Sequence, residues 1–129
     1  MNIKTLMFLK KASGGSGEQN LLDYTDLVNK TYGGDTNMNN VRPNNKIAVE
    51  PGTSLVLTGP QVSEVDIRFY DENATYQSSK TIEVYKSGTV EINFTVPEGM
   101  YYMLPKWYLS TGELPVETFI QSNPVIKYA

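Results

Sequence analysis

The fold is decided by Thr89-Val-Glu-Ile-Asn-Phe-Thr-Val96, a stretch in which apolar and polar residues alternate strictly. This alternation places Val90, Ile92, Phe94 and Val96 on one face of a β-strand. A helix would send the same four side chains to opposite sides of its axis. The stretch therefore predicts a strand with one face in a hydrophobic core and the other in solvent.

The same period recurs on either side of a short turn, Lys86-Ser87-Gly88. Glu64–Tyr70 alternates in the same way, and so does Thr81–Tyr85. Short alternating runs separated by turn clusters about 8–12 residues apart are typical of an antiparallel β-sandwich, of jelly-roll or immunoglobulin-like type. The predicted core consists of Val65, Ile67, Phe69, Ile82, Val84, Val90, Ile92 and Phe94.

Shorter runs extend the all-β prediction to the rest of the chain. Proline has no N–H for a ladder, so Pro105 is expected to end a strand. Residues 29–46 are rich in Asn, Gly, Asp and Thr without apolar periodicity, which predicts a long irregular loop. A helix is compatible only with Asn20–Lys30. The further strands are expected at Lys46–Val49, Ser54–Thr58, Met100–Leu104, Trp107–Leu109, Val116–Ile120 and Val125–Tyr128.

The N-terminal segment differs in composition from the rest of the chain. Residues 1–17 contain three lysines and no acid, whereas the other 112 residues contain 8 basic and 14 acidic groups. Ala12–Gly17 is a Ser/Gly joint, so we expect 1–17 to be a flexible arm and 18–129 a sandwich domain. The alternative is a solvated basic terminus. The predicted partner-anchoring residues are Ile3, Leu6, Met7, Phe8, Leu9, Lys10 and Lys11.

Composition excludes several classes of function. The 129 residues include no histidine and no cysteine, which removes zinc sites, thiol nucleophiles and Ser-His-Asp triads. Asp66, Glu83 and Glu91 fall on polar strand faces, where solvated carboxylates belong, so we predict no catalysis, no metal and no cofactor. Two arginines on a chain of net charge −3 argue against nucleic-acid binding. The apolar run Leu6–Leu9 is too short for a signal peptide or a membrane span.

Aromatic residues are densest between Tyr101 and Tyr108. Aromatic faces stack on sugar rings, so this cluster is a candidate glycan surface. The alternative is that alternation sends Tyr102 and one of Trp107 or Tyr108 into the core. The Asp35–Asn37 and Asp71–Asn73 clusters are interpreted as turn caps rather than calcium ligands. The possible glycan-binding residues are Tyr102, Trp107, Tyr108 and Arg68.

Four short motifs in a fixed order carry a family resemblance. They are Asn20-Leu-Leu-Asp23, Ile47-Ala-Val-Glu-Pro-Gly52, Val65-Asp-Ile-Arg-Phe-Tyr-Asp71 and Phe94-Thr-Val-Pro-Glu-Gly99. This series resembles the jelly-roll, carbohydrate-binding-like modules of tailed-phage tail, fibre and virion accessory proteins. The resemblance covers about residues 20–109 and implies a β-sandwich in a virion assembled in the bacterial cytoplasm.

Two functions follow as expectations. The first is a non-enzymatic structural accessory protein of a phage virion, a head fibre, decoration or tail-associated protein. Its arm would anchor it to other virion proteins, and it would form a homo-oligomer. The second is a carbohydrate-binding module that attaches to host or gut polysaccharide. Neither function requires nucleic acid or a membrane.

Overall fold

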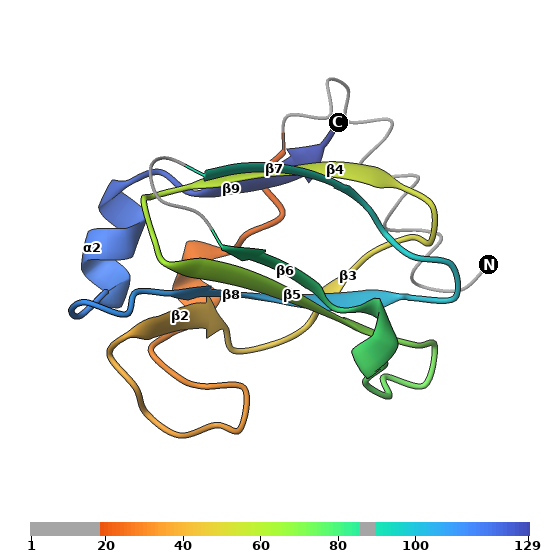
Figure 1. The fold of residues 1–129 in the computed structure, drawn as a ribbon. Helices are drawn as coiled ribbons and strands as arrows, with labels where there is room; N and C mark the ends of the chain where they lie inside the picture. Colours follow the sequence, from red (N-terminus) through yellow and green to blue (C-terminus); the bar gives the residue numbers. More distant parts are fainter. Residues whose placement is uncertain (1–18, 86–89) are drawn as a thin grey trace.

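The computed structural model describes residues 19–85 and 90–129, which form an all-β sandwich of two antiparallel sheets (Figure 1). The predicted arm, 1–17, and all of its candidate anchoring residues lie outside the described residues. Within the described part of the chain, no helix is long and apolar enough to span a bilayer. The sequence prediction of an antiparallel sandwich is confirmed.

The large sheet has the strand order β1-β2-β8-β5-β6, and β3 also pairs with β8. The small sheet has the order β7-β4-β9. The large sheet consists of β1 (Leu27–Val28), β2 (Asn40–Pro43), β3 (Ile47–Ala48), β5 (Glu64–Tyr70), β6 (Ile82–Tyr85) and β8 (Tyr102–Tyr108). The small sheet consists of β4 (Ser54–Gly59), β7 (Val90–Thr95) and β9 (Val125–Tyr128). The helices are η1 (Tyr24–Asp26), η2 (Ser78–Lys80) and α2 (Val116–Gln121).

One hydrophobic core fills the space between the sheets. The inward faces of β5 and β7 supply Val65, Ile67, Phe69 and the β7 stripe, as their alternation predicted. Ile82 and Val84 at the edge of the large sheet are partly buried and pack against this core. Six of the eight residues predicted to form the core are therefore buried in it, and the other two pack against it.

Trp107 is the largest fully buried side chain. Its ring packs against Phe119 of α2, with ring centroids 4.7 Å apart. A Cβ at Gly59 would lie 2.9 Å from Trp107 Nε1, so only glycine allows β4 to pass this close to the indole. Trp107 therefore ties β8 to both α2 and the small sheet.

The prediction that Pro105 ends a strand is wrong, because β8 runs through it. Pro105 pairs with Ile67 of β5 on one side. On the other side β8 meets β3 up to Met103 and β2 from Trp107, so Pro105 lies opposite the gap between them. A missing N–H removes no ladder bond there.

Three further sequence predictions need correction. Val116–Ile120 is helical, because Pro115 precedes the first turn, Glu117 lies within it and Asn123 ends it at φ 56°. Residues 29–46 include strand β2 as well as irregular chain. Asn20–Lys30 forms only the single 3-10 turn η1, capped by Asp23, before β1.

Candidate functional site

The outer face of the large sheet concentrates charge and aromatic rings. Because side chains alternate, the outward residues of β5 are Glu64, Asp66 and Arg68, and Lys106 of β8 lies directly opposite Asp66. Lys106 Nζ is 3.9 Å from Asp66 Oδ2, and both side chains are mostly buried. The residues that cover Lys106 and Asp66 are therefore part of the site.

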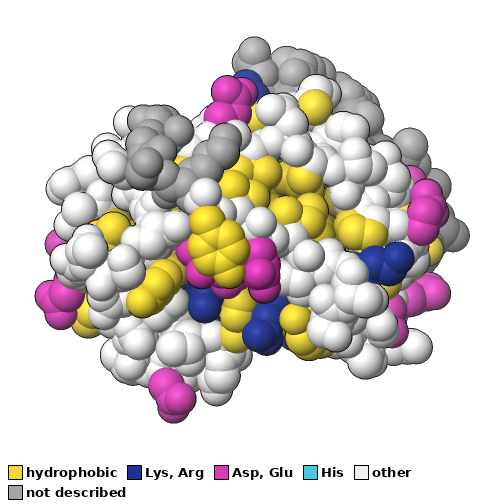
Figure 2. Space-filling model, viewed as in Figure 1, with side chains coloured by type: hydrophobic (Ala, Val, Ile, Leu, Met, Phe, Trp, Pro, Cys, Tyr) yellow, Lys and Arg dark blue, Asp and Glu magenta, His cyan; other side chains and the backbone are white. Residues whose placement is uncertain are grey.

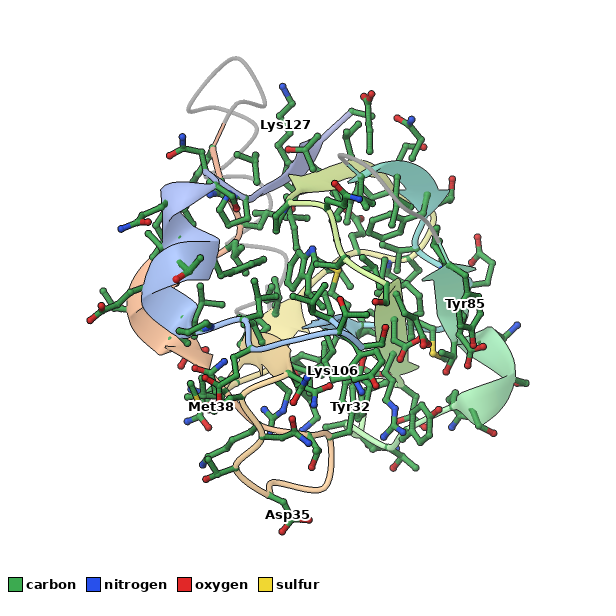
Figure 3. The ribbon with its side chains drawn as sticks, turned by 60° about the vertical axis from the view of Figure 1, so that its left-hand side comes forward. Tyr32, Asp35, Met38, Tyr85, Lys106 and Lys127 are labelled. Atoms are coloured by element: carbon green, nitrogen blue, oxygen red, sulfur yellow. The ribbon has the colours of Figure 1, made fainter. Side chains whose placement is uncertain are left out.

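Tyr32, from the loop before β2, covers the middle of this face. Its hydroxyl donates to the carbonyl oxygens of Leu104 (2.9 Å) and Asp66 (3.1 Å), which join β8 to β5. Lys106 Nζ lies 4.6 Å from the centre of its ring, and Figure 3 shows the two side chains together. Burial strongly raises the pKa of the Tyr32 hydroxyl, so it acts as a hydrogen-bond donor.

Arg68 is clamped between two aromatic rings. Its guanidinium carbon lies 3.9 Å from the Tyr32 ring centroid and 4.5 Å from that of Tyr76. The Tyr76 ring also packs against Tyr70, with centroids 5.8 Å apart. Two rings on one guanidinium fix its position and favour its charge.

Arg42 holds the loop that carries Tyr32. Its side chain is buried, and it donates to the carbonyl oxygens of Thr31 (2.9 Å) and Pro43 (2.8 Å). Asn29 ties the start of the same loop to the carbonyl of Leu114, ahead of α2. The irregular loop is therefore anchored at several points and places Tyr32 on the sheet.

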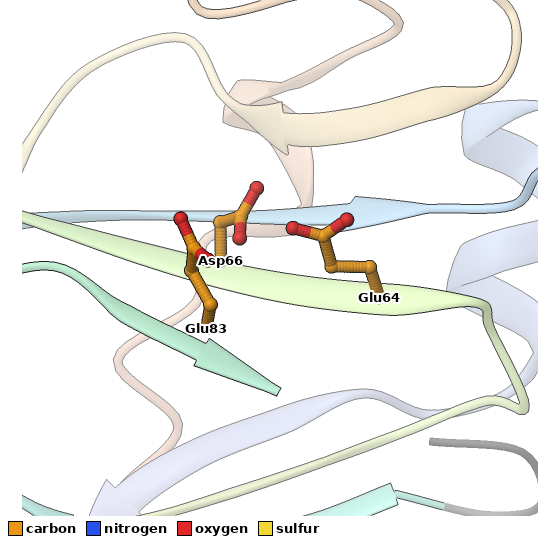
Figure 4. A group of neighbouring side chains, drawn as sticks. All are labelled: Glu64, Asp66 and Glu83. Atoms are coloured by element: carbon orange, nitrogen blue, oxygen red, sulfur yellow. The ribbon is translucent and has the colours of Figure 1, made fainter. Parts of the chain in front are cut away.

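Three carboxylates meet on the outer face of β5 and β6 (Figure 4). Glu64 and Asp66 come from β5 and Glu83 comes from β6, and one oxygen of each lies within 4.8 Å of the others. In the described part of the chain, this is the group of acids close enough to hold a metal ion. Lys106 already supplies a positive charge on one side of it. We call Glu64, Asp66 and Glu83 the carboxylate cluster.

Within the carboxylate cluster, the pKa of Asp66 is raised. Burial, followed by the hydrogen bond and charge of Glu64, raises the pKa of Asp66 to about 7, although Lys106 and Arg68 oppose the rise. A hydrogen bond between two carboxyl groups requires that one of them keep its proton. Asp66 Oδ1 is otherwise buried without a donor. The cluster can therefore share a proton or bind an additional cation near neutral pH.

Tyr85 marks the end of the site at the sheet edge. It lies on β6 opposite Glu64, and its side chain is 69% exposed. Its hydroxyl donates to Glu83 Oε2 at 3.3 Å. The charges of Glu64 and Glu83 raise the pKa of this hydroxyl, which keeps it protonated.

The structure separates the predicted glycan-binding residues. Trp107 is fully buried, so including it in a glycan surface was wrong, and the alternative of a core position holds for it. Tyr102, Tyr108 and Arg68 all lie on the outer face of β8 or β5. Arg68 is already held by its two rings, whereas Tyr108 lies opposite Glu64 and Asn40.

Sequence reasoning missed Tyr32, Tyr76 and Lys106, because none of them falls in a motif. It was right about one acidic turn: Asp71 Oδ1 accepts from the backbone N–H groups of Asn73 (2.9 Å) and Thr75 (3.0 Å). These bonds cap the turn between β5 and η2 and hold the pKa of Asp71 below its usual value.

The site therefore combines three neighbouring carboxylates, of which Asp66 has a pKa of about 7, with clamped cations and an exposed tyrosine, an arrangement that can bind a cationic or hydroxyl-rich partner. No family model, no curated protein and no solved structure matches this chain.

Proposed function

We propose that this chain is a non-enzymatic structural accessory protein of a phage virion, attached through its N-terminal arm. The observation that carries the proposal is that the core of the described residues runs from Leu21 to Ile126. Leu21 N donates to Ile126 O at 2.7 Å, so the chain is already bonded to β9 at Leu21, close to the first described residue. This supports assigning residues 1–17 to a partner rather than to the sandwich core.

The composition of the arm fits an attachment that is weak for a single arm and strong when several arms of one oligomer bind together. Burying Leu6, Phe8 or Leu9 contributes about 1.5–3 kcal/mol each. Ordering the backbone opposes this by about 1–2 kcal/mol per residue. A single arm therefore holds weakly, whereas several arms on one oligomer hold well, because each later contact is intramolecular.

Deleting residues 1–17 tests the proposal. The truncated chain should keep its β-sheet circular dichroism spectrum and its cooperative unfolding, but it should no longer co-sediment with particles. A chain with Lys4, Lys10 and Lys11 changed to Gln is the matched control for charge alone. Normal incorporation of the truncated chain would contradict the proposal, and so would its unfolding.

A second candidate is polysaccharide binding on the outer face of the large sheet. Tyr85 favours it, because an exposed ring beside Glu64 and Glu83 offers both stacking and hydrogen-bond acceptors. Polysaccharide binding that is lost in Tyr85→Ala and kept in Tyr76→Ala would support this candidate. Equal binding by both variants and by the parent would exclude this surface.

A further inference from the structure

The outer edge of β6 has no strand beside it among the described residues. Gln77 N donates to Phe69 O at 3.0 Å, which shows that the odd-numbered residues of β5 point their backbone groups toward the β6 side. Val65 lies opposite Val84 and Ile67 lies opposite Ile82, so these are the pairs whose backbone groups face each other. By alternation, the N–H and C=O groups of Glu83 and Tyr85 point away from the sheet. An extended segment can be received there.

Apolar surface runs along the same edge. Figure 1 shows β6 and β7 one above the other, and Figure 2, in the same view, shows hydrophobic side chains gathered between their two levels. Ile82 and Val84 are partly buried and pack on the core from β6, while Ile92 and Phe94 pack from β7. A strand added to β6 would cover Ile82 and Val84 with its inward side chains.

The carboxylate cluster lies on the outward side of this edge. Glu83 belongs to β6 itself, and Glu64 and Asp66 lie on the adjacent strand. Lys106 approaches Asp66 alone, at 3.9 Å, and Arg68 is held between Tyr32 and Tyr76. A strand added to β6 would therefore meet uncompensated negative charge on its outward side.

Residues 1–11 have the complementary pattern. In an extended chain, Ile3, Met7 and Leu9 fall on one face, with Lys11 at the end of that face next to the Ser/Gly joint. Lys4, Leu6, Phe8 and Lys10 fall on the other face, and the segment contains no acid. The first face matches the apolar edge at Ile82 and Val84. The second face brings the Lys4 ammonium group to the carboxylate cluster and the apolar side chain of Leu6 to Tyr85.

We propose that residues 1–11 of a second copy add a strand to the outer edge of β6, with Lys4 facing Glu64 and Glu83 and Leu6 beside Tyr85. This inference rests on the proposed function of the arm and names its first partner as another copy of this chain. Backbone pairing supplies affinity, and the charges fix which edge is chosen.

The position at which the described chain starts favours docking of the arm on a second copy rather than on its own molecule. Asn20 Nδ2 donates to Pro124 O at 3.1 Å, and Leu21 is bonded to Ile126, so the described chain starts beside β9. The small sheet has the order β7-β4-β9, and β7 follows β6 after four residues, so this start lies on the side opposite the β6 edge. Such contacts join copies head to tail and leave one terminal arm free for a virion partner.

Cysteine cross-linking tests the contact, because the full chain has no cysteine of its own. Leu6→Cys chains are mixed with Tyr85→Cys chains under mild oxidation. A disulfide requires the two Cα atoms to come within about 7 Å. We expect a dimer joining the two variants, and no such dimer with Asp35→Cys, an exposed position on the loop before β2. Equal cross-linking to both positions would overturn the inference.

A charge exchange provides a second test. Sedimentation of full-length Lys4→Glu/Lys10→Glu should show self-association about tenfold weaker or more, and so should Glu64→Lys/Glu83→Lys. A mixture of the two variants should associate again, because the reversed arm now meets a reversed edge. Failure of the mixture to associate, with both variants folded by circular dichroism, would overturn the inference.

The outcomes separate the inference from the proposed function. If removal of residues 1–17 abolishes particle binding while Leu6→Cys never cross-links to Tyr85→Cys, the arm anchors to another virion protein and the second-copy contact is wrong. If a Leu6→Cys/Tyr85→Cys chain closes a disulfide only within itself, docking occurs in the same molecule, which also overturns the inference.

Discussion

The outer faces of the two sheets differ sharply, although one core supports both. The small sheet presents short side chains and isolated charges, whereas the large sheet presents three carboxylates within 4.8 Å and a guanidinium between two rings. The outward residues of the small sheet are Ser54, Val56, Thr58, Glu91, Asn93, Thr95, Val125 and Lys127.

This difference shows where the molecule carries features that stability alone does not require. Neighbouring carboxylates repel one another, and a buried acid is destabilised when it ionises. Among the described residues, the outer face of the small sheet has neither neighbouring carboxylates nor a buried acid. We therefore infer that the outer face and free edge of the large sheet form the interaction surface, and that the small sheet provides support.

The largest expected effect concerns the core that both faces share. Trp107→Ala should lower the free energy of unfolding by about 3–5 kcal/mol, because it removes the ring that packs on Phe119 and beside Gly59. Urea unfolding followed by circular dichroism measures the loss. Tyr108→Phe, on the outer face next to it, should change the free energy by less than about 1 kcal/mol. Equal losses would contradict the placement of Trp107.

The next effect tests whether the covering loop supports the large sheet. Tyr32→Phe keeps the ring but removes the hydrogen bonds to Leu104 O and Asp66 O, which should destabilise the fold by about 1–2 kcal/mol. Tyr85→Phe is the matched control, since its hydroxyl is exposed, and should stay within about 0.5 kcal/mol of the parent. A Tyr32→Phe variant as stable as the parent would show that the loop does not stabilise the large sheet through these hydrogen bonds.

A third effect depends on pH and is confined to the large sheet. The pKa of Asp66 in the fold is about 7, above its ordinary 3.8, because of burial and Glu64, against Lys106 and Arg68. The folded state therefore holds this proton more tightly, so the stability that Asp66 contributes is fully present below its ordinary pKa of 3.8 and is lost as pH rises through 7. Glu83 and Tyr32 also face the group.

Asp66→Asn should remove this fall, which we expect to amount to roughly 1–2 kcal/mol because solvent and Lys106 screen part of it. Unfolding midpoints measured from pH 4 to pH 8 provide the comparison. Glu91→Gln, on the small sheet, should keep the slope of the parent. A parent protein whose stability does not change between pH 5 and pH 8 would contradict the coupling within the carboxylate cluster.

The smallest effects should come from the outer face of the small sheet. Lys127→Ala and Glu91→Gln should each change the free energy of unfolding by less than about 0.5 kcal/mol, because neither side chain forms an ion pair with another described residue. Thermal unfolding detects larger changes. A loss above 1 kcal/mol for either variant would mean that this face is not inert.

Strict alternation made most of the fold predictable from sequence. Glu64–Tyr70 and Val90–Thr95 were expected as strands with the observed inward faces. Val116–Ile120 was misassigned, because a short apolar run fits either structure and the preceding Pro115 decides for the helix. Which of Trp107 and Tyr108 faces the core could not be decided until the phase of β8 was known, since continuity through Pro105 depends on the gap between β2 and β3.

The candidate site was less predictable, because it is made by register rather than by motif. Asp66 and Glu83 lie on the outward strand faces as predicted, but the expectation of solvated carboxylates is wrong for Asp66, whose side chain is mostly buried. Only the β5–β6 pairing sets the two acids opposite each other. Tyr32 comes from a loop without periodicity and reaches the sheet through the anchoring of Arg42. Cross-strand proximity and long-range loop docking leave no pattern in a single sequence.

The central claim is that the arm docks on the β6 edge of the large sheet. Amide hydrogen exchange by mass spectrometry, comparing the full chain with its Lys4→Glu/Lys10→Glu variant at equal concentration, tests it most directly. We predict that the amides of Ile82–Tyr85 exchange faster in the variant, while those of Val90–Thr95 exchange at the same rate in both proteins. Unchanged exchange in β6, or a change confined to β7, would contradict the account.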